Sequence, residues 1–170
     1  MVSTIITHLI GVAALIAILT MIIMYTGFMT QTMFYNNIKS NLEYVSQMIA
    51  LQLKYGITSG TNTTLTLDYP VVIGKNIYYN VYIGNGSVLS EKIPILTGKL
   101  SPLSIYVVAA TPSNSIYAYT RVCNTTYDEK QVIVANGYII FGSGTITRIS
   151  ITRTRTNIAI TIKEILVRVS

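Results

Sequence analysis

The hydrophobic pattern divides the chain into two parts with different periods. From Val2 to Tyr25 almost every residue is apolar, and no Asp, Glu, Lys or Arg occurs before Lys39. A helix of about 20 apolar residues crosses the hydrocarbon core of a bilayer. We therefore predict a helix in a membrane or in an equally apolar setting. A cleaved secretory signal is the competing interpretation. The sequence argues against it, because no basic residue precedes the apolar run and no small-x-small cleavage site follows it.

Beyond Gly27 the apolar residues recur at helical spacing. Steps of three and four residues place one stripe on a single helix face: Phe34, Ile38, Leu42, Val45, Ile49 and Leu53. We predict a long N-terminal helix over residues 1–56, with an apolar half at 1–29 and an amphipathic half at 30–55. Gly56 is expected to stop it, and Lys54 would then favour the helix dipole from the last turn. One uninterrupted helix is favoured over a break near Gly27.

Residues 57–170 show the signals of an all-β domain. Short runs of strand-forming residues alternate with turn residues, which predicts an Ig-like β-sandwich and an α+β fold class for the chain. Asn136-Gly137 is predicted as the turn of a hairpin, and Gly84-Asn85-Gly86 as another tight turn. No helical period is evident after Gly56. The expected strands cover residues 63–69, 77–83, 104–110, 115–122, 131–135, 138–141, 145–155 and 158–169.

The last two strands depart from strict alternation. Ile146 and Ile149 cannot share one face of a regular strand, so a β-bulge is expected near Thr147 or Arg148. The final strand carries isoleucines at 158, 160 and 162 on one face and apolar residues at 165, 167 and 169 on the other. It is therefore expected to be buried on both faces or to change its packing partner.

Composition argues against catalysis. Apolar residues make up 51% and charged residues 11%, with a net charge of +6. The chain has one cysteine, Cys123, and one histidine, His8, which excludes an internal disulfide and a Cys/His zinc site. The only close acidic pair, Asp128-Glu129, is typical of a solvated turn. We expect no enzymatic activity, no catalytic residue, no cofactor and no metal.

Two further patterns concern the surface. The basic stretch from Arg148 to Arg155 is interpreted as charge that protects an edge strand, with an acidic cell-surface partner as the alternative and no nucleic acid expected. Three N-x-[ST] sequons, at Asn62, Asn85 and Asn124, fall at predicted turns or strand ends. An acceptor asparagine must be exposed, so we expect N-glycans on at least one of them, with Asn124 favoured.

The whole arrangement resembles the archaeal type IV pilin superfamily. The resemblance is carried by VSTIITHLIGVAALIAILTMIIMYTGF, by the amphipathic NNIKSNLEYVSQMIALQLKYG and by LDYPVVIGKNIYYNVYIG. It implies a filament subunit whose helices form the core and whose sandwiches face outward, with a pilus assembly machine, the membrane and a surface layer as partners. Family precursors carry a short basic leader, and the numbered sequence starts without one. Either the numbering begins at the mature chain or the chain is an unprocessed relative.

That difference defines a second interpretation. Accessory proteins of the archaellum motor share the plan with an uncleaved helix, and they act as membrane-anchored stators whose sandwich binds the surface layer. The filament interpretation is preferred because the apolar stripe persists to Leu53. It predicts a cell-surface filament that is membrane-embedded before assembly, with small residues allowing close helix approach. The expected polymerisation residues are Ile5, Ile6, Leu9, Gly11, Ala13, Ala14, Ile16, Ala17, Ile22, Phe28, Phe34, Ile38, Leu42, Val45, Ile49 and Leu53.

Overall fold

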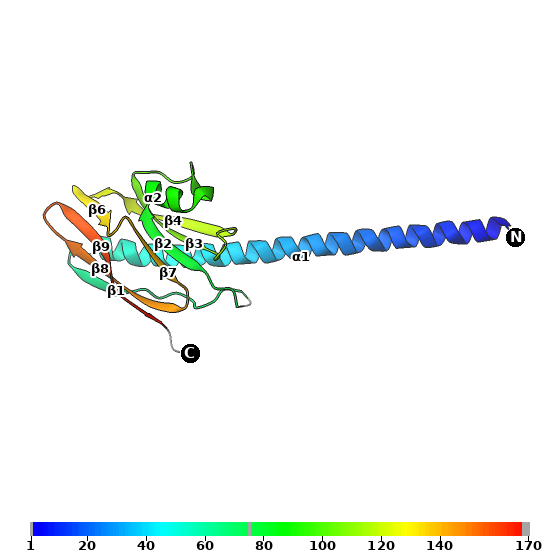
Figure 1. The fold of residues 1–170 in the computed structure, drawn as a ribbon, viewed down its shortest axis with the longest axis horizontal. Coiled ribbons are helices and arrows are strands. Elements are labelled where there is room, and N and C mark those ends of the chain that lie inside the picture. Colours follow the sequence, from blue (N-terminus) through cyan, green and yellow to red (C-terminus); the bar gives the residue numbers. More distant parts are fainter. Residues whose placement is uncertain (1, 75, 168–170) are drawn as a thin grey trace. The chain divides into compact units, whose positions relative to one another are not determined.

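The protein has an α+β fold, as the sequence predicts. The computed structural model describes residues 2–74 and 76–167 (Figure 1). Its helices are α1 (Val2–Thr58), α2 (Gly86–Lys92) and the 3-10 helix η1 (Pro94–Leu96). Its strands are β1 (Thr63–Thr66), β2 (Asn80–Asn85), β3 (Ser104–Ala110), β4 (Tyr117–Asn124), β5 (Thr126–Tyr127), β6 (Lys130–Val134), β7 (Tyr138–Gly142), β8 (Thr145–Arg153) and β9 (Asn157–Val167).

Helix α1 runs without interruption, so the favoured uninterrupted form is confirmed and the alternative, a break near Gly27, is absent. Gly56 does not stop the helix, which continues to Thr58. A Cβ atom on Gly56 would lie 2.5 Å from Cδ1 of Ile151, so this glycine permits close contact between the helix and the sheet. Lys54 consequently lies before the last turn. A guanidinium nitrogen of Arg153 on β8 instead donates to the Ile57 carbonyl at the helix end.

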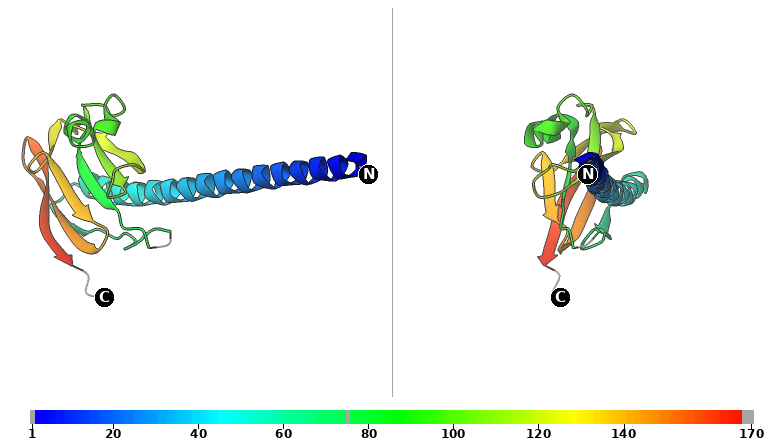
Figure 2. Two further views of the ribbon diagram at one scale, coloured as in Figure 1. Left: turned by 45° about the vertical axis from the view of Figure 1, so that its right-hand side comes forward. Right: turned by 90° about the vertical axis from the view of Figure 1, so that its right-hand side faces the viewer.

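Two sheets form the β-domain (Figure 2). The first has the order β1-β8-β9-β6-β5, and the second has the order β4-β3-β2-β7. The β6–β9 pair is parallel and the other pairs are antiparallel. The chain separates into two compact units, Met1–Asn37 and Ile38–Ser170. The boundary between them lies within the amphipathic half of the helix, after Asn37, whereas the sequence placed it after residue 56.

The part of α1 from Ile38 onward belongs to the β-domain because its apolar stripe is buried there. Leu42, Val45, Ile49 and Leu53 are fully buried in one core with residues from both sheets. The hydroxyls of Ser46 and Thr120, on α1 and the edge strand β4, lie 2.8 Å apart. Near the opposite edge strand β1, the Gln52 amide exchanges two hydrogen bonds with the backbone of Asp68, at 3.1 and 3.2 Å. The helix therefore lies between one edge of each sheet and fills that side of the sandwich.

Two predicted turns have a different role in the structure. Asn136 and Gly137 do turn in the left-handed region, with φ of 58° and 82°. They do not close a hairpin, because β6 pairs with β9 in one sheet and β7 pairs with β2 in the other. Strand β2 continues through Gly84 and Asn85, and α2 begins at Gly86, so the tight turn predicted there is wrong. Asn85 is the N-cap of α2, and its side chain accepts a hydrogen bond from the Ser87 amide.

Helix α2 and η1 were not expected from the sequence. They cover the outer face of the second sheet and form a second apolar cluster with it (Figure 1). The buried members of this cluster are Tyr82, Leu89, Ile93, Leu96, Leu100, Tyr106, Val108 and Ala110. Both helices are too short for a 3.6-residue period to stand out in the sequence, because α2 has seven residues and η1 has three.

The β-bulge expected near Thr147 or Arg148 is present at that position, but the extra residue lies on β9. The register shifts between Arg148 and Ile149, which pair with Glu164 and Ile162, so Lys163 has no opposite residue. Ile146 and Ile149 lie on different faces because Thr147 takes the inward position. Its hydroxyl lies 3.0 Å from the Tyr69 hydroxyl.

Strand β8 lies between β1 and β9, so the basic stretch does not protect an edge strand. Arg148 instead forms an ion pair with Glu164 at 2.9 Å. The last strand changes its neighbours along its length. Ile158 and Ile160 are buried where β6 pairs with β9, and the apolar residues from Ile162 to Val167 are exposed beyond that pairing. The prediction that both faces of the last strand are buried is therefore wrong, and residue 169 lies outside the described residues.

A pair of leucines on α1 tests the placement of the helix in the core. Leu42 is fully buried and Leu51 is 67% exposed. We expect Leu42→Ala to lower the free energy of unfolding by about 2–5 kcal/mol, and Leu51→Ala to change it by less than about 0.5 kcal/mol. Thermal unfolding of the full chain in detergent, followed by near-UV circular dichroism, measures both. Equal effects of the two substitutions would contradict burial of the stripe.

Candidate functional site

The most prominent surface of the described chain is the apolar part of α1. We call the side chains of residues 5–35 the apolar helix surface. Every described residue from Ile5 to Asn37 is exposed within the chain. By length and composition alone, this helix can cross a membrane. The large apolar side chains here are Ile5, Ile6, Leu9, Ile10, Val12, Leu15, Ile16, Ile18, Leu19, Met21, Ile22, Ile23, Met24, Tyr25, Phe28, Met29, Met33, Phe34 and Tyr35.

Threonine hydroxyls on this surface are bonded to the helix itself. Thr20, Thr26, Thr30 and Thr32 each donate to the carbonyl four residues earlier, at 2.8–2.9 Å. A hydroxyl that is already hydrogen-bonded can enter an apolar environment without leaving an unsatisfied donor. These threonines are therefore compatible with close packing away from water. The sole histidine, His8, is exposed on the same surface.

The structure divides the expected polymerisation residues into two groups. Five of them are in the core of the β-domain and cannot contact another chain: Ile38, Leu42, Val45, Ile49 and Leu53. The other eleven are exposed on the apolar helix surface: Ile5, Ile6, Leu9, Gly11, Ala13, Ala14, Ile16, Ala17, Ile22, Phe28 and Phe34. The sequence could not separate the groups, because an apolar side chain on a helix can be buried equally well by its own chain or by another copy.

Two glycines on the apolar helix surface are not required by close packing within their own chain. A Cβ atom on Gly11 or on Gly27 would meet nothing within 4 Å. Glycine in a helix interior costs about 1 kcal/mol relative to alanine. Gly27 lies in a shallow hollow lined by Ile23, Thr26, Thr30, Gln31 and Phe34. Such a hollow on a helix can receive a side chain from a neighbouring helix.

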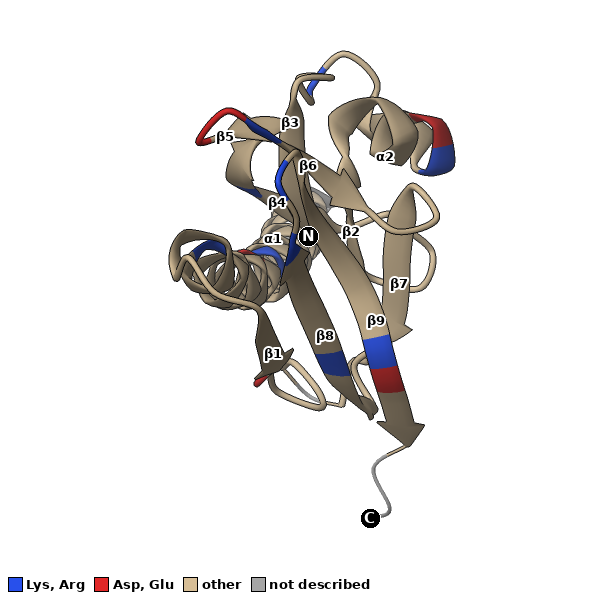
Figure 3. Cartoon of the chain, turned by 90° about the vertical axis from the view of Figure 1, so that its left-hand side faces the viewer, with Lys and Arg blue, Asp and Glu red and all other residues tan. Residues whose placement is uncertain are grey.

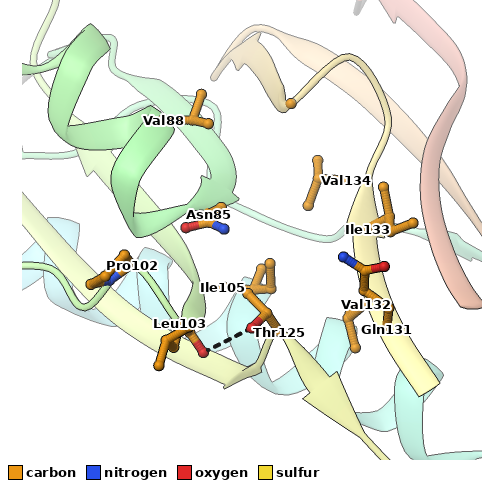
Figure 4. Close-up of a pocket in the computed structure, with 11 residues that line it drawn as sticks. Asn85, Val88, Pro102, Leu103, Ile105, Thr125, Gln131, Val132, Ile133 and Val134 are labelled. Atoms are coloured by element: carbon orange, nitrogen blue, oxygen red, sulfur yellow. Dashed lines mark hydrogen bonds between the residues drawn. The ribbon is translucent and has the colours of Figure 1, made fainter. Parts of the chain in front are cut away.

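The β-domain contains a pocket of about 390 Å³ near the N-terminus of α2 (Figure 4). Side chains from β2, β3 and β6 point toward it, including Asn85, Ile105 and Gln131 (Figure 4). Thr125 donates a hydrogen bond to the Leu103 carbonyl at its rim, at 3.3 Å. None of the eleven lining residues is titratable, so the pocket offers no acid, base or thiol for catalysis.

A second depression has a different character. A groove of about 380 Å³ between α1 and β4 is lined by Gln47, Ala50, Leu51, Lys54, Thr120 and Arg121, and we call it the basic groove. Cys123 lies two residues after Arg121 on β4. Burial raises the pKa of the Cys123 thiol from 9.0 to about 11, although Arg121 and Lys54 act in the opposite direction.

Metal ligands do not gather anywhere in the described ranges, 2–74 and 76–167: no group of three or more His, Cys, Asp or Glu side chains is placed to hold an ion. The three sequon asparagines differ in their surroundings. Asn62 and Asn124 are exposed, and Asn85 is half-buried. The side-chain oxygen Oδ1 of Asn62 accepts a hydrogen bond from the backbone amide of Arg153 at 2.7 Å. Oδ1 of Asn124 accepts one from the Ser104 hydroxyl at 3.3 Å.

No protein-family model, no curated protein and no solved structure matches this chain. Its function therefore has to be argued from the surfaces described above.

The raised pKa of Cys123 predicts a pH-dependent loss of stability. A thiol whose pKa is higher in the folded chain stabilises the fold fully below the unfolded pKa, and this contribution is lost as the pH rises from 9 to about 11. We expect the melting temperature of the wild type to fall more across this window than that of Cys123→Ser, by a few degrees. Thermal unfolding of both chains at pH 8, 9, 10 and 11 measures the difference. Parallel curves would contradict the burial argument.

Proposed function

We propose that the chain is a structural subunit of an extracellular filament of the type IV pilus kind. The apolar helix surface packs against copies of itself, and the β-domain faces outward. Before assembly the same surface holds the subunit in the membrane, from which an assembly machine extracts it. The partners implied are further copies of this chain, that machinery, the membrane and N-glycans, and a surface layer or another cell surface is a possible outer contact.

One observation carries this proposal: the exposed apolar surface is longer than a bilayer requires. Ile5 to Tyr35 are 31 residues, or about 46 Å of helix, and the hydrocarbon core is about 30 Å thick. If residues 5–24 span the membrane, the following turns lie outside it. There Phe28, Met33 and Phe34 are 67%, 64% and 54% exposed. Exposed apolar surface of this extent is typical of a protein contact.

Two properties of the same segment support packing between helices. The bonded threonine hydroxyls allow a water-free contact, and Gly11 and Gly27 leave room for the backbone of a neighbour. Burial of apolar surface contributes about 25 cal/mol per Å², so a bundle of such helices requires no salt bridges. The absence of charge before Lys39 is consistent with that mode of assembly.

The second candidate is a membrane-anchored accessory protein, such as a stator of an archaellum motor. It is favoured by the fact that residues 5–24 alone are sufficient to cross a bilayer, so that no polymer is required to bury them. This interpretation leaves the apolar residues between Tyr25 and Asn37 exposed to water. The filament proposal buries them.

Substitutions in that intermediate segment separate the two candidates. We expect Phe28→Lys combined with Met33→Lys to abolish filaments, because each buried unpaired charge costs several kcal/mol, while the chain still enters the membrane through residues 5–24. Electron microscopy of surface filaments, with mass spectrometry of their subunit, measures assembly. Carbonate extraction measures insertion.

The control variant is Leu103→Lys, which places the same charge on an apolar side chain of the β-domain that is 69% exposed. It should form filaments like the wild type. If the chain occurs only in membrane fractions together with motor components, and the double variant behaves normally there, the accessory-protein candidate replaces the filament.

The sequons yield a graded prediction. We expect glycans on Asn124 and Asn62, which are exposed, and none on Asn85. Asn85 is half-buried and its side chain caps α2, next to Gly86, where a Cβ atom would lie 2.2 Å from the Ser101 carbonyl oxygen. Glycopeptide mapping of the natively produced chain measures occupancy at each site. Sugar on Asn85 alone would contradict this order. Three bare asparagines would contradict it too and would also weaken the extracellular placement.

A further inference from the structure

The basic groove combines two cations with an apolar floor and lacks acidic residues. Lys54 comes from α1 and Arg121 from β4, and both are exposed. Neither forms an ion pair, because the one ion pair found between described residues is Arg148–Glu164. A guanidinium nitrogen of Arg121 donates to Oδ1 of Asn124, which orients the side chain beside the groove.

The two cations act on the same region of the surface. Both side chains line one groove, Lys54 from α1 and Arg121 from β4. The Ala50 and Leu51 side chains and the Gln47 amide complete the lining. An arrangement of two adjacent positive charges with a neighbouring amide favours a ligand that presents two carboxylates.

Such a pair of carboxylates is present on another element of the same chain. Tyr127 and Lys130 pair directly, so Asp128 and Glu129 form the two-residue tip of the β5–β6 hairpin. We call this pair the acidic tip. Both residues are exposed, and Figure 3 shows them as the red segment that follows β5. Neither forms an ion pair within the described ranges of its own chain.

The backbone of the acidic tip is unfavourable for these residues. Asp128 and Glu129 have φ of 52° and 59°, in the left-handed region. A two-residue turn of this kind prefers Asn-Gly or Asp-Gly, and a side chain such as that of Glu129 carries a steric cost there. The fold therefore holds two carboxylates at an exposed tip where glycine would be more stable.

We propose that the acidic tip of one chain docks into the basic groove of the next copy, and that this contact sets the register between neighbouring β-domains. The proposal rests on the proposed filament function. The tip and the groove are different surfaces, so the contact is heterologous. A heterologous contact propagates from copy to copy instead of closing on a symmetric pair.

Charge explains why a second copy is favoured over another acidic partner. All eighteen charged residues occur from Lys39 onward and leave a net charge of +6 per copy. Neighbouring β-domains in a filament therefore repel one another unless opposite charges meet locally. The acidic tip provides two negative charges for the two positive charges of the groove. Charge pairs of this kind contribute to specificity and register more than to overall affinity.

Charge reversal tests the contact with the full-length chain. One variant carries Asp128→Lys and Glu129→Lys, and the other carries Lys54→Glu and Arg121→Glu. We expect each alone to need about tenfold more subunit for assembly, the change that corresponds to one good charge pair. Mixing the two variants should restore assembly, because each then offers a complementary surface to the other. Filament formation is measured by sedimentation and by electron microscopy.

A control variant matches the change in net charge of the groove variant. Lys39→Glu combined with Lys163→Glu reverses two exposed cations outside the groove and should assemble like the wild type. Near-UV circular dichroism reports the fold of every variant, and Asp128→Asn with Glu129→Gln replaces the reversal if Lys at the tip prevents folding. Unchanged assembly of the reversed variants overturns the proposal. Loss without rescue on mixing also overturns it.

Cross-linking separates this contact from the filament proposal itself. A carbodiimide joins a lysine amine to a carboxylate only when they touch. Isotope-labelled and unlabelled full-length chains are mixed in detergent and treated with it. A mixed-isotope peptide linking Lys54 to Asp128 or Glu129 supports the docking even if no filaments form. Absence of that peptide overturns the docking even if filaments do form. Binding of acidic polysaccharide that the groove variant abolishes, with self-assembly unchanged, also overturns it.

Discussion

Burial of the second half of α1 is the interaction on which the β-domain depends. The two sheets leave β1 and β4 as edge strands on one side of the sandwich, and the helix fills the space between them. Leu42, Ile49 and Leu53 enter the core shared by both sheets. Gly56 lets the helix approach Leu65 and Ile151 closely. An open sandwich would expose both apolar inner faces, so the helix is a structural part of the domain as well as its connection to the N-terminal segment.

The same helix carries two kinds of apolar surface, one buried within the chain and one exposed. After Ile38 the apolar side chains on one face are buried within the chain, and the exposed face carries polar residues together with Tyr44, Leu51 and Tyr55. Before Asn37 apolar side chains surround the helix and none is buried. A helix that is apolar all round requires a membrane or neighbouring helices. Because this surface extends beyond the length of a bilayer crossing, a membrane alone would leave part of it exposed to water, and the proposed neighbouring helices would bury that part.

The charged residues lie in the β-domain, whereas the extended exposed apolar surface lies in the N-terminal unit. The N-terminal unit has no Asp, Glu, Lys or Arg, so contacts between copies in the proposed filament would depend there on shape and apolar area. The β-domain carries every charge, and its only described ion pair, Arg148–Glu164, lies on the surface and contributes little to stability. Lys54, Arg121 and the acidic tip form no ion pair within the described residues. They would give direction to the proposed assembly, because apolar contacts are non-directional.

The sequence by itself determined the helix, the β-domain and the α+β class, because helical spacing and strand alternation persist over long segments. The spacing of Leu42, Val45 and Ile49 identified a buried face correctly. It could not say whether the burial partner is the chain's own sandwich or another copy, since both impose one period. Local signals at Asn136-Gly137 gave the turn geometry, and only long-range pairing placed β6 and β7 in different sheets. The basic groove likewise required tertiary structure, because Lys54 and Arg121 are 67 residues apart in the chain and meet only where α1 packs beside β4.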